Sequence, residues 1–210
     1  TYKDASKYGL SITLGGGEVM MVEMNTAFGV LANMGTKQNL TSILKVIGKK
    51  GEVIDEYKYV PGDRVLSRET SYIIGDILSD DGARSMVFGR GSMLNIKGQT
   101  VSVKTGTTND LRDNWTIGYT PDYVVTTWVG NNNNSKMGGI VSGTTGAAPI
   151  WNKIMTKILE GKTTKKPPVP ASIVMMNVCN LTGELPPEEG CESHNEYFKK
   201  EFAPRNRVSL

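Results

Sequence analysis

Two runs of β-forming residues, Asn114 to Tyr119 and Tyr123 to Gly130, are separated only by Thr120-Pro121-Asp122. Proline and aspartate favour tight turns, so the two runs are predicted to be neighbouring strands of a hairpin. A third short strand is predicted from Val101 to Thr105. Strands in hairpin order, interleaved with helices, point to an α+β fold with an antiparallel sheet.

Three helices are predicted around this sheet. Residues 17–34 have apolar side chains at helical spacing, and Gly35 is placed to end that helix. Ser67 suits the N-cap of a second helix, with Glu69 in its first turn, and Pro149 suits the first turn of a third. The expected buried faces consist of Tyr72, Ile73, Ile77 and Leu78 in the second helix, and of Ile150, Ile154, Ile158 and Leu159 in the third.

Other segments are interpreted as smaller elements or connections. Thr41 to Tyr59 alternates in polarity and is split by Lys49-Lys50-Gly51, which predicts a two-stranded hairpin. Asp80-Asp81 is interpreted as a helix end, followed by a glycine-rich stretch from Gly82 to Gly98. Asn131 to Gly139 is interpreted as a polar loop.

A change in composition at Gly161 suggests how the chain is divided. The segment after it is rich in lysine, threonine and proline, which is typical of a solvated linker. We expect a main domain over residues 1–160, a linker over 161–171 and a small tail module over 172–210.

Size and charge exclude several classes of protein. The net charge of +3 over 210 residues, with no stripe of basic side chains, argues against a nucleic-acid partner. No run of about 18 apolar residues occurs, so no membrane span is expected. His194 is the only histidine, and no metal site or cofactor is expected. The chain begins with Thr1, which suggests a fragment or a processed product.

The two cysteines, Cys179 and Cys191, lie in a stretch rich in proline, glycine and glutamate. A disulfide between them would close a short loop and contribute on the order of 3 kcal/mol. Two unrelated thiols are the alternative, and the residues alone do not decide between these interpretations.

The segment from Val101 to Thr108 carries the chemistry of greatest interest. The ammonium group of Lys104 is suited to holding a carboxylate or lowering the pKa of a nearby nucleophile. Gly106 lets a ligand approach the backbone, and the hydroxyls of Thr105 and Thr107 are suited to bonding an anionic group. An exposed strand edge can also pair with an extended peptide.

A Lys-Thr-Gly triplet alone is weak, because it arises by chance in roughly one chain in twenty of this length. It gains meaning beside S-x-x-K and S-D-N, with which it forms the signature of penicillin-binding proteins and class A β-lactamases. Its sequence context is therefore decisive.

Ordered blocks over nearly the whole chain resemble class A penicillin-binding proteins. These blocks are Tyr8 to Val19, Asn25 to Gly35, Lys104 to Thr108, Arg112 to Trp115, Gly118 to Pro121, Trp128 to Asn131 and Gly146 to Trp151. The tail resemblance rests on Cys179, Gly183, Pro186, Cys191 and Glu196 to Phe198. Such an ordered set is far more specific than one triplet.

The resemblance implies an enzyme that cross-links peptidoglycan through a serine acyl-enzyme and that binds β-lactams. It implies that Lys104 helps to bind the terminal carboxylate of a stem peptide, which Thr105 and Thr107 also bond. The backbone N–H of Thr107 would supply half of the oxyanion hole. Gly106 and Thr108 would belong to the same substrate-binding wall.

The resemblance also favours the disulfide between Cys179 and Cys191. It implies a location on the outer face of a bacterial membrane, with an anchor and a glycosyltransferase domain upstream of this chain. The partners would be peptidoglycan stem peptides, β-lactams and the upstream part of the same protein.

The chain departs from the family in the motifs that should precede Lys104. Ser42-Ile43-Leu44-Lys45 matches S-x-x-K, but it lies in a predicted strand, where positions i and i+3 point to opposite faces. The second motif of the family has the spacing S-x-N. The string Ser193-His194-Asn195 has this spacing, but it lies in the tail, after Lys104 rather than before it. We therefore expect the catalytic serine to lie upstream, and this chain alone to be inactive and not to be acylated by β-lactams.

Two other interpretations stay open. A D,D-carboxypeptidase or a serine β-lactamase would share the Lys-Thr-Gly motif, although the tail after Gly161 argues against both. A non-catalytic module that binds or senses wall peptides is the other alternative, since the chain lacks the serine.

Overall fold

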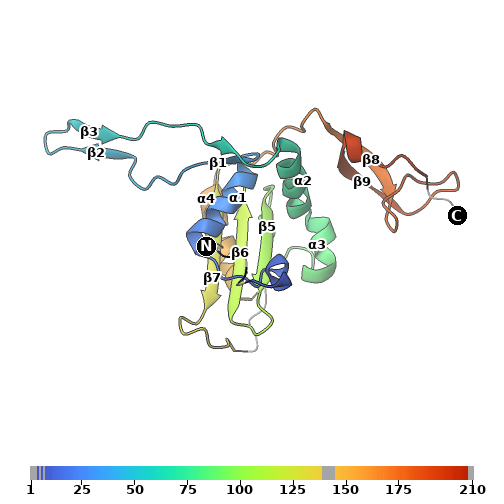
Figure 1. Cartoon of the computed structure of the whole chain (residues 1–210), viewed down its shortest axis with the longest axis horizontal. Helices are drawn as coiled ribbons and strands as arrows, with labels where there is room; N and C mark the ends of the chain where they lie inside the picture. The colour runs from blue at the N-terminus through green and yellow to red at the C-terminus, as the bar shows by residue number, and fades with distance from the viewer. Residues whose placement is uncertain (1–3, 5, 7, 139–144, 208–210) are drawn as a thin grey trace.

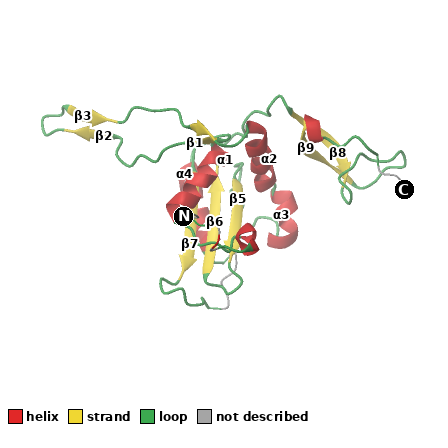
Figure 2. Ribbon diagram, viewed as in Figure 1, coloured by secondary structure: helices red, strands yellow, loops and turns green. Residues whose placement is uncertain are grey.

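The computed structural model describes residues 4, 6, 8–138 and 145–207 (Figures 1 and 2). Its central sheet has the strand order β5-β6-β7, with all neighbours antiparallel. The strands are β5 (Ser102–Thr107), β6 (Asp113–Tyr119) and β7 (Val124–Gly130). The predicted antiparallel sheet is confirmed, and β5 extends two residues beyond its predicted end.

Helices cover both faces of this sheet. Adjacent residues of a strand point to opposite faces, so Thr126 and Thr127 of β7 identify the helix on each side. The Thr126 hydroxyl donates to Asn25 Oδ1 of α1 (Met21–Ala32) at 2.7 Å. The Thr127 hydroxyl donates to the carbonyl of Ala147, at the start of α4 (Ala147–Leu159), at 3.0 Å. The α+β class is therefore confirmed.

Trp151 of α4 lies at the centre of the core and is completely buried. A Cβ atom on Gly118 of β6 would lie 2.3 Å from Cζ2 of the Trp151 ring, so the indole packs where β6 has no side chain. An apolar cluster packs around Trp151. Its other buried members are Leu94, Ile96, Val101, Val103, Val125, Ala148, Met155 and Leu159.

The predicted buried face of α4 was wrong for two of its residues. Ile150 and Ile154 are 49% and 41% exposed, whereas Trp151 and Met155 are buried. Both sets have a spacing of four residues, so periodicity alone fits either stripe. The space left by the missing side chain of Gly118 holds the indole, and the isoleucines face the surface.

The first two helices begin and end close to their predicted bounds. Helix α1 starts at Met21 rather than at residue 17, after a 3-10 turn at Leu10–Leu14, and Gly35 follows it with a φ of +95°. Helix α2 (Arg68–Ser79) starts as predicted, with the Ser67 side chain accepting a hydrogen bond from the N–H of Thr70. Ile77, expected to be buried, is exposed.

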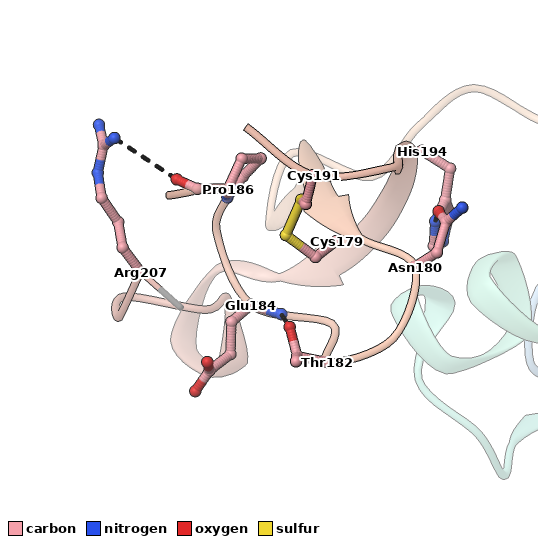
Figure 3. The surroundings of a disulfide bond; sticks show 8 residues. All are labelled: Cys179, Asn180, Thr182, Glu184, Pro186, Cys191, His194 and Arg207. Atoms are coloured by element: carbon pink, nitrogen blue, oxygen red, sulfur yellow. Dashed lines mark hydrogen bonds between the residues drawn. A yellow bond between two sulfur atoms is a disulfide. The ribbon is translucent and has the colours of Figure 1, made fainter. Parts of the chain in front are cut away.

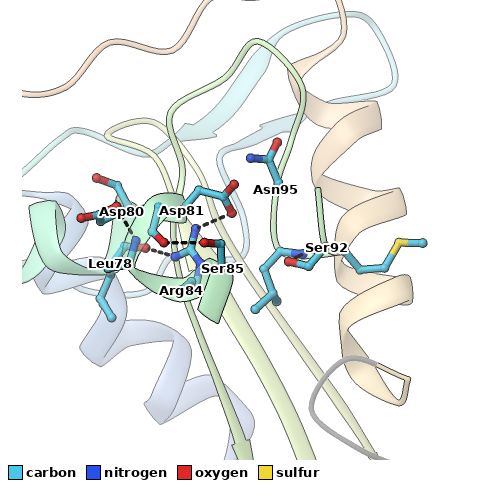
Figure 4. A network of polar contacts seen from close by, with 12 residues as sticks. Leu78, Asp80, Asp81, Arg84, Ser85, Ser92 and Asn95 are labelled. Carbon is cyan, nitrogen blue, oxygen red and sulfur yellow. Dashed lines mark hydrogen bonds and ion pairs between the residues drawn. The ribbon is translucent and has the colours of Figure 1, made fainter. Parts of the chain in front are cut away.

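The glycine-rich stretch contains a helix that the sequence did not predict, α3 (Asp81–Phe88). Asp80 ends α2 and caps α3, accepting a hydrogen bond from the N–H of Ala83 at 2.9 Å. Arg84 holds the junction by donating to the carbonyl of Leu78 at 2.6 Å (Figure 4). Two helices therefore meet where one helix end was predicted.

The predicted hairpin between Thr41 and Tyr59 is present and extends away from the sheet (Figure 1). Strand β2 (Lys45–Ile47) pairs with β3 (Val53–Glu56), and every residue of both strands is exposed. A short ladder of β1 (Thr36–Lys37) with β4 (Asp63–Arg64) forms its base. We call residues 38–62 the arm.

The tail is a second hairpin, on the opposite side of the molecule in Figure 1. It consists of β8 (Ile173–Cys179) and β9 (Ser193–Lys199), followed by a 3-10 turn at Lys200–Phe202. A disulfide joins Cys179 to Cys191 (Figure 3).

The residues predicted to be a linker make several contacts with the main body. Thr164 exchanges hydrogen bonds with Gln99 and Thr100, and Lys166 pairs with Asp76 of α2 at 2.6 Å. The division into domain, linker and tail stays a prediction. The structure adds that the segment between them follows the surface of the main body.

None of the helices in the described part of the chain is long and apolar enough to cross a bilayer.

Candidate functional site

In the described part of the chain, strand β5 pairs with β6 on one side and with no strand on the other, which we call its open edge. Helix α2 lies beside the first residues of β5, where the Ser102 hydroxyl donates to the carbonyl of Gly75 at 2.7 Å. In an antiparallel ladder, hydrogen-bonded and non-hydrogen-bonded pairs alternate. The N–H of Thr108 donates to the carbonyl of Asp113 at 3.1 Å, just beyond the end of β5. Counting in steps of two from this bond, the backbone groups of Gly106 and Lys104 face β6. Those of Thr107 and Thr105 therefore face the open edge, as do those of Val103, which is buried.

The opposite end of β6 gives the same register. The N–H of Thr120 donates to the carbonyl of Tyr123 at 2.9 Å, so even-numbered residues of β6 bond to β7. Odd-numbered residues of β6 then bond to β5, which agrees with the count from Thr108. The N–H of Thr107 is thus directed away from the sheet.

Lys104 is exposed on the face of the sheet opposite α4. Its partner across the ladder is Ile117, and its ammonium group donates to the carbonyl of Thr105 at 2.5 Å. That carbonyl faces the open edge, so the ammonium group lies beside the same edge. The charge of Lys104 and the backbone groups of Thr105 and Thr107 therefore lie along the same edge.

Thr105 and Gly106 complete the exposed part of the strand. Thr105 is partly buried and pairs with Thr116, while Gly106 is exposed opposite Trp115. A Cβ on Gly106 would meet nothing closer than 3.9 Å, at Trp115 Cβ. This residue therefore leaves the surface of the strand open rather than filling a space in the core.

The hydroxyl of Thr107 is held from behind by Asn114 of β6. Asn114 Nδ2 donates to Thr107 Oγ1 at 2.8 Å, and Asn114 Oδ1 accepts from the backbone N–H of Ala147 at 2.6 Å. Asn114 has no exposed surface. One buried amide therefore connects the end of β5 to the start of α4.

Thr108 lies in the β5–β6 turn, where its hydroxyl bonds to the backbone of the turn. Its Oγ1 accepts hydrogen bonds from the N–H groups of Arg112 and Asp113, at 2.9 and 3.0 Å. From the loop after β7, Lys136 contacts Asp110 of this turn at 2.9 Å and holds the pKa of that carboxyl below its usual value. The turn is therefore held by its own polar groups and by a lysine from the loop after β7.

Asp113 braces the same end of the sheet, on the side of β7. Its carboxylate accepts a hydrogen bond from Trp128 Nε1 at 2.9 Å, across the β6–β7 ladder. The carboxylate of Asp113 therefore has a structural partner in β7.

A small pocket lies beside the start of β5, at the opposite end of the strand from Thr107. Its volume is about 40 Å3, and Ser102, Tyr119 and Asp76 are among its lining residues. Burial raises the pKa of the Tyr119 hydroxyl to about 12. Lys104 and Thr107 do not line this pocket, so the candidate site is an open strand edge.

The S-x-x-K match and the S-x-N match both lie outside the central sheet that carries Lys104. Ser42 is in a bend and Lys45 begins β2 in the arm, where its ammonium group contacts Glu56 at 2.9 Å. Ser193 to Asn195 lie in β9 of the tail. Neither string is in a helix, so neither has the serine-to-lysine geometry that a helix provides.

Asn114 is the site residue that sequence reasoning missed. It lies in the Arg112-Asp113-Asn114-Trp115 block, which was recognised only as part of the family pattern. Its position directly opposite Thr107 in the ladder identifies it, and that register is seen in the structure and not in the sequence.

Known proteins share this sequence pattern and this fold. Residues 4–156 match the family model described as "Penicillin binding protein transpeptidase domain". Penicillin-binding protein 1A of Clostridium botulinum (strain Hall) is 34% identical over 181 residues, covering 83% of this chain and 21% of the relative. The protein of the same name from Aquifex aeolicus is 30% identical over 199 residues, covering 92% and 26%.

Solved structures agree in fold. Penicillin-binding protein 1A from Haemophilus influenzae superposes with a TM-score of 0.84 at 24% identity, covering 98% of this chain and 36% of that one. PonA1 of Mycobacterium tuberculosis, solved in complex with penicillin V, gives a TM-score of 0.64 at 24% identity, covering 75% and 43%.

The chain thus spans about a fifth to a quarter of the length of these two curated relatives. Over that span the chain is similar in sequence and in fold to a portion of penicillin-binding protein 1A. The chain belongs to the penicillin-binding protein transpeptidase family.

Proposed function

We propose that this chain forms the Lys-Thr-Gly wall of a peptidoglycan D,D-transpeptidase that works through a serine acyl-enzyme. The observation that carries this proposal is the open edge of β5, toward which the N–H of Thr107 points beside the ammonium group of Lys104. An extended stem peptide can lie along such an edge and pair with its backbone.

Each group along the edge has a defined task in this reaction. The serine oxygen attacks the carbonyl carbon between two D-alanines, and the carbonyl oxygen becomes an oxyanion. The N–H of Thr107 stabilises that oxyanion, and one such donor contributes about 3 kcal/mol to lowering the barrier. Lys104, with the hydroxyls of Thr105 and Thr107, holds the carboxylate of the terminal D-alanine.

Collapse of the tetrahedral intermediate breaks the peptide bond. The terminal D-alanine leaves as an amine after taking the proton that the serine gave up, and an ester to the enzyme remains. The amine of a second stem peptide attacks this ester, which forms the cross-link and returns a proton to the serine. A β-lactam follows the same first step, but its ring opens and no group departs.

The serine and the residues that activate it would come from the upstream part of the same protein. The absence of a usable S-x-x-K in this chain supports this division, since the one match lies in the arm. The resemblance to class A members further implies that the full-length protein carries a membrane anchor and acts outside the cytoplasmic membrane. Stem peptides and β-lactams are its proposed ligands.

The test uses the full-length protein and this chain in parallel, each incubated with a fluorescent penicillin and separated by denaturing electrophoresis. We expect a labelled band for the full-length protein and none for this chain. Labelling of the chain alone would disprove the upstream serine, and absence of labelling in both would favour a non-catalytic binding module. Product analysis with a stem peptide and an added amine separates transfer from hydrolysis.

The role of Lys104 has its own matched comparison. In the full-length protein, K104A is expected to slow acylation about tenfold to a hundredfold, because a charge-assisted hydrogen bond is lost. K97A removes an exposed lysine on the segment before β5 and should leave the rate unchanged. Equal rates for the two variants would contradict the assignment of Lys104.

A further inference from the structure

We propose that Asn114 is a positioning residue that sets the direction of the Thr107 hydroxyl proton and so makes Thr107 a donor to the substrate carboxylate. This inference rests on the proposed function and deepens it. It concerns a buried side chain that does not touch substrate, and it follows from the polarity of two hydrogen bonds.

The orientation of the Asn114 amide is determined by its neighbour in α4. The backbone N–H of Ala147 can only donate, so the atom 2.6 Å away must be the oxygen of the amide. The NH2 group of Asn114 therefore faces Thr107, where it donates to Oγ1 at 2.8 Å. The choice between the two amide orientations follows from chemistry alone.

The direction of this hydrogen bond determines which role is left to the Thr107 hydroxyl. A threonine hydroxyl has one proton and two lone pairs, and one lone pair is occupied by Asn114. The proton is free to point elsewhere, and Thr107 is exposed at the open edge of β5. An outward O–H bonds a carboxylate, whereas an outward lone pair would repel one.

The same contact also anchors α4. The first N–H groups of a helix have no partner within the helix, and the N-cap Gly146 provides no side chain for Ala147. Asn114, in the neighbouring sheet, acts as the cap by accepting a hydrogen bond from the N–H of Ala147. The amide is thus held at both ends, which keeps the donor to Thr107 in place before any ligand arrives.

The decisive variant is N114D, which keeps the shape of the side chain and its bond to the N–H of Ala147. Its ionised carboxylate has no proton to donate, so the Thr107 hydroxyl would turn inward and present a lone pair to the substrate. In the full-length protein, we expect acylation by penicillin to slow about tenfold to a hundredfold. Acylation by the penicillin methyl ester, which lacks the carboxylate charge, should slow much less.

The pH dependence provides a readout that a purely structural role would not change. At lower pH the carboxyl of N114D becomes protonated and donates to Thr107 as the amide does. The rate of N114D relative to the unchanged protein should therefore rise as the pH falls. A constant ratio at all pH values, or an equal effect on the ester, would overturn the proposal.

A double-mutant cycle with T107V separates an effect through Thr107 from simple misfolding. T107V removes the hydroxyl, so N114D should cause no further loss of rate in T107V, and N114S serves in the same cycle if N114D does not fold. Additive losses would show that Asn114 acts on the fold rather than through Thr107. If the unchanged full-length protein is not acylated, the proposed function itself fails, which is distinct from failure of this inference.

Discussion

The arm and the tail are both two-stranded antiparallel hairpins outside the central sheet, yet they are supported very differently. A two-stranded hairpin is at best marginally stable in water. The tail has a disulfide, and Tyr197 of β9 packs edge-to-face on Tyr72 of α2 with ring centroids 5.3 Å apart. The arm has its own ladder and the exposed ion pair Lys45–Glu56, which contributes little.

The difference shows that hairpin stability here comes from what lies next to the strands. Both hairpins contain β-branched and apolar residues, but β2 and β3 are exposed throughout, whereas Ile173, Val178 and Cys179 of β8 are buried. The sequence predicts that each segment pairs with itself. Support by a helix and a disulfide distinguishes a fixed module from a projecting arm.

The largest expected effect comes from removing the disulfide with C179S/C191S. Loss of the loop constraint should weaken the tail by on the order of 3 kcal/mol. Hydrogen exchange of the β8 and β9 amides should accelerate strongly while that of β6 stays unchanged. Unchanged exchange in the tail would mean that the disulfide does not distinguish it from the arm.

A smaller effect is expected for Y197A. The edge-to-face contact with Tyr72 contributes about 1 kcal/mol beyond simple burial, so the tail should detach from α2 more often. Limited proteolysis within residues 161–171 measures this detachment. Y57A, in the exposed arm, is the matched control. Residues 161–171 of Y57A should be cleaved no faster than those of the unchanged chain.

Acid should loosen the same junction. The Ser172 hydroxyl donates to the Glu69 carboxylate and holds the pKa of Glu69 below 4.5. A lowered pKa in the folded state means that the contact is fully present above pH 4.5 and is lost as the pH falls through the lower value. Proteolysis of residues 161–171 should therefore increase in acid, and E69Q should lose this pH dependence.

The smallest effect is expected in the arm itself. Ile54 is 66% exposed, so I54S should change the free energy of unfolding by less than about 0.5 kcal/mol. Urea denaturation of the chain measures it. A loss of roughly 2 kcal/mol, the amount expected for burying such a side chain, would show that the arm is covered in solution and that its contrast with the tail is false.

The sequence predicted the sheet, its hairpin turn and the capped start of α2 because each depends on residues adjacent in the chain. Ser67 caps α2 through Thr70, and Thr120 closes its own turn. The buried stripe of α4 could not be predicted, because the choice between Ile150 and Trp151 depends on the gap at Gly118, far away in sequence. Helix α3 was missed because glycine composition hid the Asp80 cap.

The candidate site was predictable in part for the same reason. Lys104 to Thr107 carry a local motif, and the open edge follows from β5 having one sequence-adjacent partner strand. Asn114 joins β5 to α4 through two contacts that depend on strand register and on the position of Ala147. Residues that act through neighbours in space leave no mark in a local pattern.

The fit of Trp151 against Gly118 makes these two positions a single unit for anyone who transplants parts of this fold. Moving α4 into a related scaffold that has alanine at the position of Gly118 would place a methyl group inside the indole ring. Chimeras should therefore exchange the strand and the helix together, and a library that varies either position alone would contain mostly unfolded members.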